Sequence, residues 1–194
     1  MHDLVIDVPG ARLRGQIAID TAIEFPERVA AVVGVAAGLG GVEGDLTPQA
    51  EALFATMEAL DEADPPDPVA IADIDILIWV DGPGQPDDRV SARIREAVRE
   101  MDEPLYQPGR IGGRPIALPP PAADRLADLR SPVLAVAGEL DVPKVAQTAR
   151  HLAANAPDTR ALIWPDVANM IGVEAPERRA AAMIEFLGPL PRWS

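Results

Sequence analysis

Two polar residues follow two apolar, strand-like segments in the last third of this 194-residue chain. Asp141 comes just after VLAVAG (133–138), and Asn169 comes just after ALIWPDV (161–167). The carboxyl ends of parallel strands meet at one edge of a sheet, where α/β proteins bind ligands, so we expect both side chains there. A carboxylate can orient a proton-transferring partner, but asparagine cannot take up a proton near neutral pH. The pair therefore offers hydrogen bonds without a general base.

Other side chains with chemical potential give weaker signals. His151 lies within ARHLAANA (149–156), which predicts a surface or half-buried helical histidine rather than a base. Arg12 and Arg14 precede a predicted helix, and we interpret them as solvated arginines rather than as an anion site. Three acidic residues lack both the spacing of a calcium loop and a nearby histidine, so we expect solvated strand edges and no metal site: Asp73, Asp75 and Asp81.

The composition limits the classes of function. The 31 acidic and 17 basic residues give a net charge of -14, which disfavours nucleic acid and anionic membrane surfaces as partners. The absence of cysteine excludes disulfide scaffolds, thiol catalysis and zinc–thiolate sites. The N-terminus carries Asp3 and Asp7 without a basic region, and the longest apolar stretch, 29–39, is too short for a bilayer. We therefore expect a cytoplasmic protein.

Strand-like and helix-like segments alternate along the chain. Apolar runs predict buried parallel strands, and apolar residues at helical spacing predict helices. The expected strands lie at 3–8, 28–38, 133–138 and 159–167, and the expected helices at 16–24, 47–64, 88–103, 142–157 and 176–190. GLGGVEG (38–44) lacks the spacing of a dinucleotide-binding loop, so no cofactor is predicted. The alternation predicts an α/β fold with a mostly parallel sheet flanked by helices.

Four stretches together resemble the C-terminal half of the α/β-hydrolase superfamily, of the bacterial esterase and lactonase type. They are GQIAIDTAIEFPERVAAVVGVAAGLGG (15–41), IWVDGPG (78–84), LRSPVLAVAGELDVP (129–143) and WPDVANMIGVEAPERRAAAMIEFL (164–187). The resemblance implies a single partial α/β-hydrolase domain over residues 1–194, with a helical cap or lid at about 42–123. It places Asp141 at the triad-acid position and Asn169 at the triad-histidine position. Four cap residues would line an apolar pocket for a small ester-like ligand: Trp79, Phe54, Met57 and Tyr106.

The sequence departs from that family at the nucleophile as well. The G-x-S-x-G elbow is expected just before residue 16, where GARLRG (10–15) places Arg12 at the serine position. In a second alignment, residues 3–14 resemble the N-terminal β-hairpin of these hydrolases, and the strands between hairpin and helix are deleted. Neither alignment supplies a serine nucleophile, because the chain contains three serines elsewhere: Ser91, Ser131 and Ser194.

Two functions are consistent with these residues. In the first, the chain is a catalytically impaired relative of small-ester and lactone hydrolases, a pseudoenzyme that binds a small apolar ligand or a partner without turnover. In the second, it is an active hydrolase of carboxylic esters or lactones whose catalytic parts come from another chain or from non-standard residues. The missing first strands would leave strand edges open, so we expect a homodimer or a partner that completes the sheet.

Overall fold

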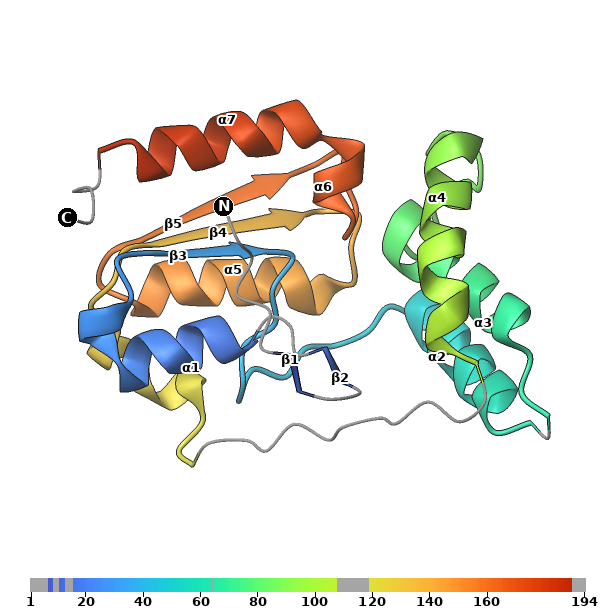
Figure 1. Ribbon diagram of the computed structural model, residues 1–194, viewed down its shortest axis with the longest axis horizontal. Coiled ribbons are helices and arrows are strands. Elements are labelled where there is room, and N and C mark those ends of the chain that lie inside the picture. Colours follow the sequence, from blue (N-terminus) through green and yellow to red (C-terminus); the bar gives the residue numbers. More distant parts are fainter. Residues whose placement is uncertain (1–6, 9–10, 13–15, 64, 108–118, 190–194) are drawn as a thin grey trace.

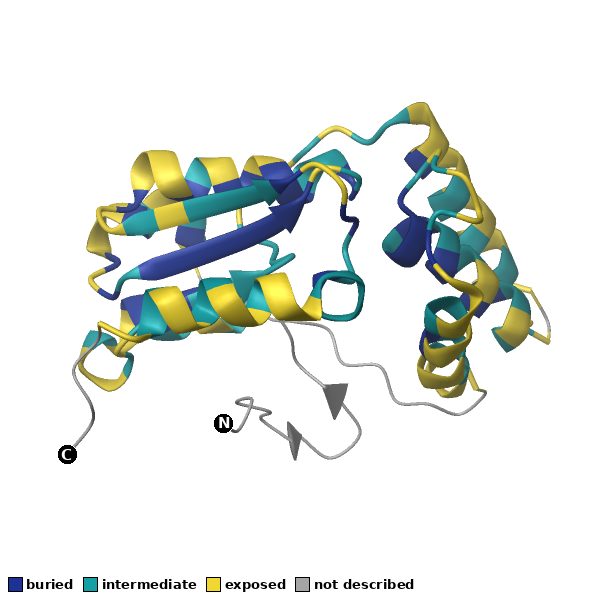
Figure 2. Ribbon diagram, turned by 90° about the horizontal axis from the view of Figure 1, so that it is seen from above, coloured by how far each residue is buried: buried dark blue, intermediate teal, exposed yellow. Residues whose placement is uncertain are grey.

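The centre of the molecule is a parallel sheet. The computed structural model describes residues 7–8, 11–12, 16–63, 65–107 and 119–189. Within them, three parallel strands are arranged in the order β3–β4–β5, namely β3 (Val32–Val35), β4 (Val133–Gly138) and β5 (Thr159–Trp164). Every residue of β4 is buried, as its uninterrupted apolar run predicts for a central strand covered on both faces (Figure 2).

Helices cover both faces of this sheet (Figure 1). Successive strand residues point to opposite faces. Val133 and Ala135 therefore pack with α1 (Gln16–Glu24) and α5 (Pro143–Asn155), whereas Leu134 and Val136 pack with α7 (Pro176–Leu187). The helices of this layer are α1 (Gln16–Glu24), η1 (Pro26–Arg28), η4 (Ala122–Asp128), α5 (Pro143–Asn155), α6 (Ile171–Glu174) and α7 (Pro176–Leu187). The predicted α/β architecture is confirmed.

A second group of helices lies beyond the carboxyl ends of the strands, within the segment predicted to be a cap, and we refer to this group as the cap (Figure 1). Its elements are α2 (Pro48–Asp61), α3 (Pro68–Asp75), the π-helical turn η2 (Ile76–Asp81), α4 (Ala92–Asp102) and the 3-10 turn η3 (Glu103–Leu105). Thr47 begins α2 as the sequence predicts, because its hydroxyl accepts from the backbone N–H of Ala50 at 3.2 Å. Of the helices in the described ranges, none is both long and apolar enough to cross a membrane.

The cap segment that contains three acidic residues differs from its prediction. Asp73, Asp75 and Asp81 lie on helical turns rather than on strand edges. Asp75 is 5% exposed and Asp81 1% exposed, so solvation was the wrong expectation for these two. Trp79 Nε1 donates to Asp75 at 3.0 Å, and Arg95 forms an ion pair with Asp81 at 2.6 Å. These partners offset part of the cost of burying a carboxylate, and burial still raises the pKa of both groups. Spacing along the sequence does not reveal such partners.

The N-terminal hairpin is antiparallel. Its strands are β1 (Asp7–Val8) and β2 (Ala11–Arg12), and Asp7 lies opposite Arg12. Arg12 is therefore on a strand of a hairpin, which agrees with the second of the two alignments. Residues 13–15, where the elbow of the first alignment would end, are outside the described residues.

Candidate functional site

The two loops that carry Asp141 and Asn169 are held together at the carboxyl edge of the sheet. The Leu140 N–H donates to the Val167 carbonyl at 3.1 Å, and the Glu139 N–H donates to the Trp164 carbonyl at 2.8 Å. Gly138 permits this approach, because a Cβ at that position would lie 2.1 Å from the Val167 carbonyl oxygen. Backbone contacts therefore fix the positions from which both side chains project.

Asp141 and Asn169 contact each other directly. Asn169 Nδ2 donates to Asp141 Oδ2 at 2.9 Å, and the Val142 N–H donates to Asp141 Oδ1 at 2.7 Å. Asp141 is only 6% exposed, and burial raises its pKa to about 6. The hydrogen bonds from Asn169 and Val142 lower this pKa, and the negative charge of Glu174 raises it further. The carboxyl group thus changes its protonation close to neutral pH.

A buried ion pair supports the Asn169 loop. The Ala168 N–H donates to Glu174 Oε1 at 3.0 Å, and Arg89 Nη1 lies 2.6 Å from Glu174 Oε2. The Arg89 and Glu174 side chains are 16% and 7% exposed, so water screens their attraction weakly. Arg89 also donates to the carbonyls of Val80 and Asp81, which ties the cap to this loop. Sequence reasoning did not identify the pair, since its members are far apart in the chain and share no local motif.

The cap also approaches Asp141 through its backbone. Gly82 has a φ of 89°, and a Cβ there would lie 2.2 Å from the Leu140 carbonyl oxygen. The Met170 N–H donates to the Trp79 carbonyl at 3.2 Å. These contacts bring η2 against the Asn169 loop and the turn after η2 against the Asp141 loop.

The four cap residues predicted to bind ligand are all half-buried. The Phe54 and Trp79 rings meet edge to face, with centroids 5.7 Å apart, and Met57 packs with them against the main core. Tyr106 donates its hydroxyl to Asp75, and burial beside that carboxylate raises the pKa of Tyr106. None of the four is among the described residues that line the groove beside β3, whose volume is about 630 Å³.

The serines and histidine of the described residues lie away from this pair. Ser131 donates its hydroxyl to the Val29 carbonyl at 2.6 Å and precedes β4, at the opposite end of that strand from Asp141. Ser91 is exposed at the start of α4 in the cap. His151 lies near the C-terminus of α5, about 12 Å along the helix axis from its start beside Asp141. Ser194 and His2 are outside the described residues.

The site can therefore exchange hydrogen bonds but has no imidazole at the pair. An amide offers two N–H donors and one acceptor oxygen, and none of them cycles a proton near neutral pH. Across the parts of the chain that the structure describes, no three His, Cys, Asp or Glu side chains converge as metal ligands. The carboxyl–amide pair is thus the chemical centre of the described site.

Neither a protein-family model nor a curated protein sequence matches this chain, whereas solved structures do. The α/β hydrolase MGS-M2 from a Medee basin deep-sea metagenome library superposes with a TM-score of 0.63 at 14% identity. This chain has part of the α/β-hydrolase fold. The match to MGS-M2 covers 92% of this chain and 63% of that protein.

Two further α/β-hydrolase-fold structures agree. Naproxen esterase from Bacillus subtilis gives a TM-score of 0.62 at 14% identity, covering 89% of this chain and 56% of the esterase. Proline iminopeptidase from Mycobacterium smegmatis gives a TM-score of 0.51 at 20% identity, covering 89% of this chain and 61% of the peptidase. The chain spans about three fifths of the length of these α/β-hydrolase-fold proteins.

Proposed function

We propose that this chain is a catalytically impaired relative of small-ester and lactone hydrolases that binds a small apolar, ester-like ligand without turning it over. One observation carries the proposal: the Asn169 amide, at the position that the resemblance gives to the triad histidine, donates its hydrogen bond to Asp141. Asp141 thus has a hydrogen-bonding partner, as the acid of a triad does, but this partner is an amide, which cannot act as a base.

The chemistry of the triad explains why turnover is lost. In a serine hydrolase the imidazole removes the proton of the nucleophile and later returns it to the leaving group, while the acid holds the imidazole tautomer. The amide of Asn169 can be held by Asp141 in the same way but can neither take nor return that proton. Ser131 is engaged with Val29 at the other end of β4 and cannot serve as the nucleophile here.

Binding is supported by the cap side of the pair. The half-buried Phe54 and Trp79 rings offer apolar surface, and the Trp79 backbone contacts the residue that follows Asn169. One N–H of the Asn169 amide is directed to Asp141, and an amide has a second N–H that can donate to an ester carbonyl. An apolar surface beside a single carbonyl-binding donor suits a small ester or lactone.

An active hydrolase is the second candidate, and one observation favours it. Because burial raises the pKa of Asp141 to about 6, its carboxylate can accept a proton near neutral pH if another chain supplies the nucleophile. The two oxygens of Asp141 are both engaged, by Asn169 and by the Val142 N–H, and this opposes such a role.

Ligand-observed NMR tests binding and turnover on one sample. Ethyl butyrate incubated with the protein should receive saturation transfer, while no ethanol or butyrate signal grows above the buffer rate. Phe54→Ala should weaken the transfer, and the matched control Phe25→Ala should not, because Phe25 is 51% exposed and follows α1, outside the cap. Growth of the ethanol and butyrate signals would disprove impaired catalysis. Absence of saturation transfer from the folded protein to ethyl butyrate would disprove binding.

A further inference from the structure

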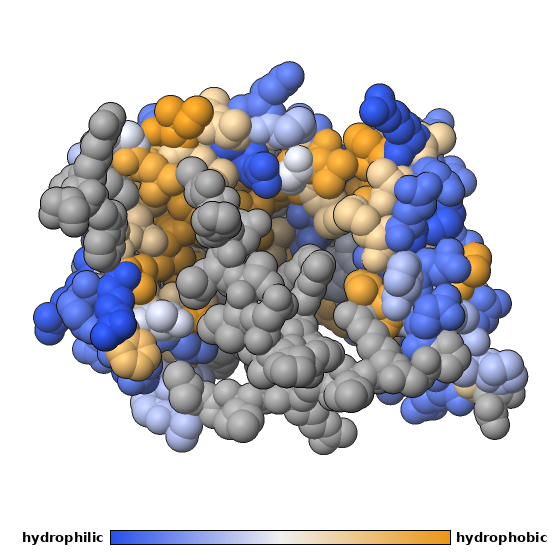
Figure 3. All heavy atoms as spheres, viewed as in Figure 1, coloured by the Kyte–Doolittle hydropathy of each residue, from blue (hydrophilic) through white to orange (hydrophobic). Residues whose placement is uncertain are grey.

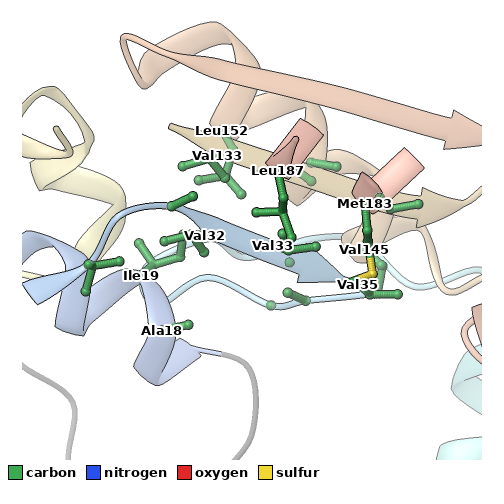
Figure 4. A pocket seen from close by; sticks show the side chains of 18 of the residues that line it. Ala18, Ile19, Val32, Val33, Val35, Val133, Val145, Leu152, Met183 and Leu187 are labelled. Carbon is green, nitrogen blue, oxygen red and sulfur yellow. The ribbon is translucent and has the colours of Figure 1, made fainter. Parts of the chain in front are cut away.

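In the part of the chain that the structure describes, β3 is an edge strand of the sheet, and an apolar groove lies along it. It lies beside β3, between α1 on one face and α7 on the other, and its volume is about 630 Å³ (Figure 4). Of the twenty described residues that line it, Arg179 alone carries a charge. Figure 3 shows apolar side chains gathered over the region of β3 and α7.

Among the described strands β3 is paired only with β4, so some of its backbone N–H and C=O groups have no strand partner on the other side. The Val32 N–H donates to the Pro132 carbonyl at 2.9 Å, and the Ala36 N–H donates to the Val136 carbonyl at 2.8 Å. In a parallel ladder, alternate residues face the same neighbour, so Val33 and Val35 direct their N–H and C=O groups away from β4. The strand sequence VVGV contains no proline or charge, the features by which edge strands avoid pairing.

We propose that a second copy of this chain pairs with β3 in an antiparallel arrangement, giving a continuous six-stranded sheet. With Val33 opposite Val35 of the second copy, the outward N–H and C=O groups of both residues pair in both copies. The two-fold axis then passes beside Gly34, at the closest Cα approach, where the absence of a side chain removes a clash. β3 is therefore complementary to a second copy of itself, and this pairing does not depend on the proposed ligand.

The helices beside the strand fit the same symmetry. A two-fold axis normal to the sheet places α7 beside α7 of the second copy. Met183 and Leu187 lie over Val35 and Val33, so they would cover the joined strands (Figure 4). The two Arg179 side chains would be about 18 Å apart along the helix direction, beyond the screening length of about 8 Å.

Sedimentation equilibrium tests the dimer. Between about 1 and 100 µM, the unmodified protein should sediment as a dimer of the 20.6 kDa chain. Met183→Lys places a charge in the groove and should weaken dimerisation at least about tenfold. The matched control Met101→Lys should leave it unchanged, because Met101 is 54% exposed on α4 in the cap. Circular dichroism establishes that each variant is folded.

A second variant tests the strand pairing itself. Val33→Pro removes an outward N–H but leaves the bonds from β3 to β4, and proline is tolerated at such edge positions. Val33→Pro should also abolish the dimer. If this variant does not fold, the comparison of Met183→Lys with Met101→Lys decides whether the groove forms the dimer interface. A monomer throughout the concentration range would overturn the proposal, as would a dimer unaffected by Met183→Lys. The proposal would also be overturned if the protein stayed monomeric and its groove became covered only when another polypeptide was added. That result would assign the β3 edge to a different partner.

Discussion

Replacing Asp141 by asparagine should stabilise the protein at neutral pH and destabilise it in acid. The rise of its pKa from the ordinary 3.8 to about 6 means that the folded state disfavours the charged form by about 3 kcal/mol. This cost is absent below pH 3.8, the ordinary pKa of aspartate in the unfolded chain, and complete above about pH 6, the pKa of Asp141 in the folded protein. Asparagine has one acceptor oxygen, so Asp141→Asn loses one of two hydrogen bonds, about 1 kcal/mol. The variant should gain about 2 kcal/mol at about pH 7.5 and lose about 1 kcal/mol near pH 3.

Urea denaturation followed by circular dichroism measures this difference at both pH values. Asp128→Asn is the matched control, since Asp128 is exposed on η4, and its stability difference should not change sign with pH. An Asp141→Asn variant less stable than the unmodified protein at about pH 7.5, or a difference that does not vary with pH, would refute the reasoning from burial.

Two further substitutions probe the support of the site. Arg89→Ala leaves Glu174 buried without its cation and should lower the free energy of unfolding by about 3 kcal/mol in urea denaturation. Arg150→Ala, which breaks the exposed pair with Glu139, should cost less than about 1 kcal/mol, and equal losses would contradict the role of burial. Gly138→Ala should lower the free energy of unfolding by about 3 kcal/mol or more, because the added Cβ would overlap the Val167 carbonyl. A urea midpoint equal to that of the unmodified protein would contradict this close approach of the two loops.

Much of the sheet layer follows from local sequence. The helix predicted at 16–24 is α1, Gln16–Glu24, and the run VLAVAG is β4, because buried parallel strands need little more than apolar β-branched and small residues. The expectation that Asp141 and Asn169 lie at one edge agrees with their hydrogen bond, since the ends of parallel strands meet there. Their functional roles stay predictions.

The cap could not be predicted to the same depth. Residues around Asp75 and Asp81 alternate between acidic and apolar types, a pattern shared by half-exposed strands and by helices that bury carboxylates. What decides between them is the presence of distant partners: Tyr106 for Asp75 and Arg95 for Asp81. The Arg89–Glu174 pair depends on the same kind of long-range contact, which only the fold creates.

The most direct test of impaired catalysis is the hydrolysis of p-nitrophenyl butyrate at about pH 8, where a histidine base would be neutral. The purified protein and its Asp141→Ala variant are compared with buffer alone, after circular dichroism shows both to be folded. If catalysis is impaired, both samples release p-nitrophenol at the buffer rate. A rate above buffer that falls on Asp141→Ala substitution would show that Asp141 still takes part in catalysis and that the chain is not catalytically impaired.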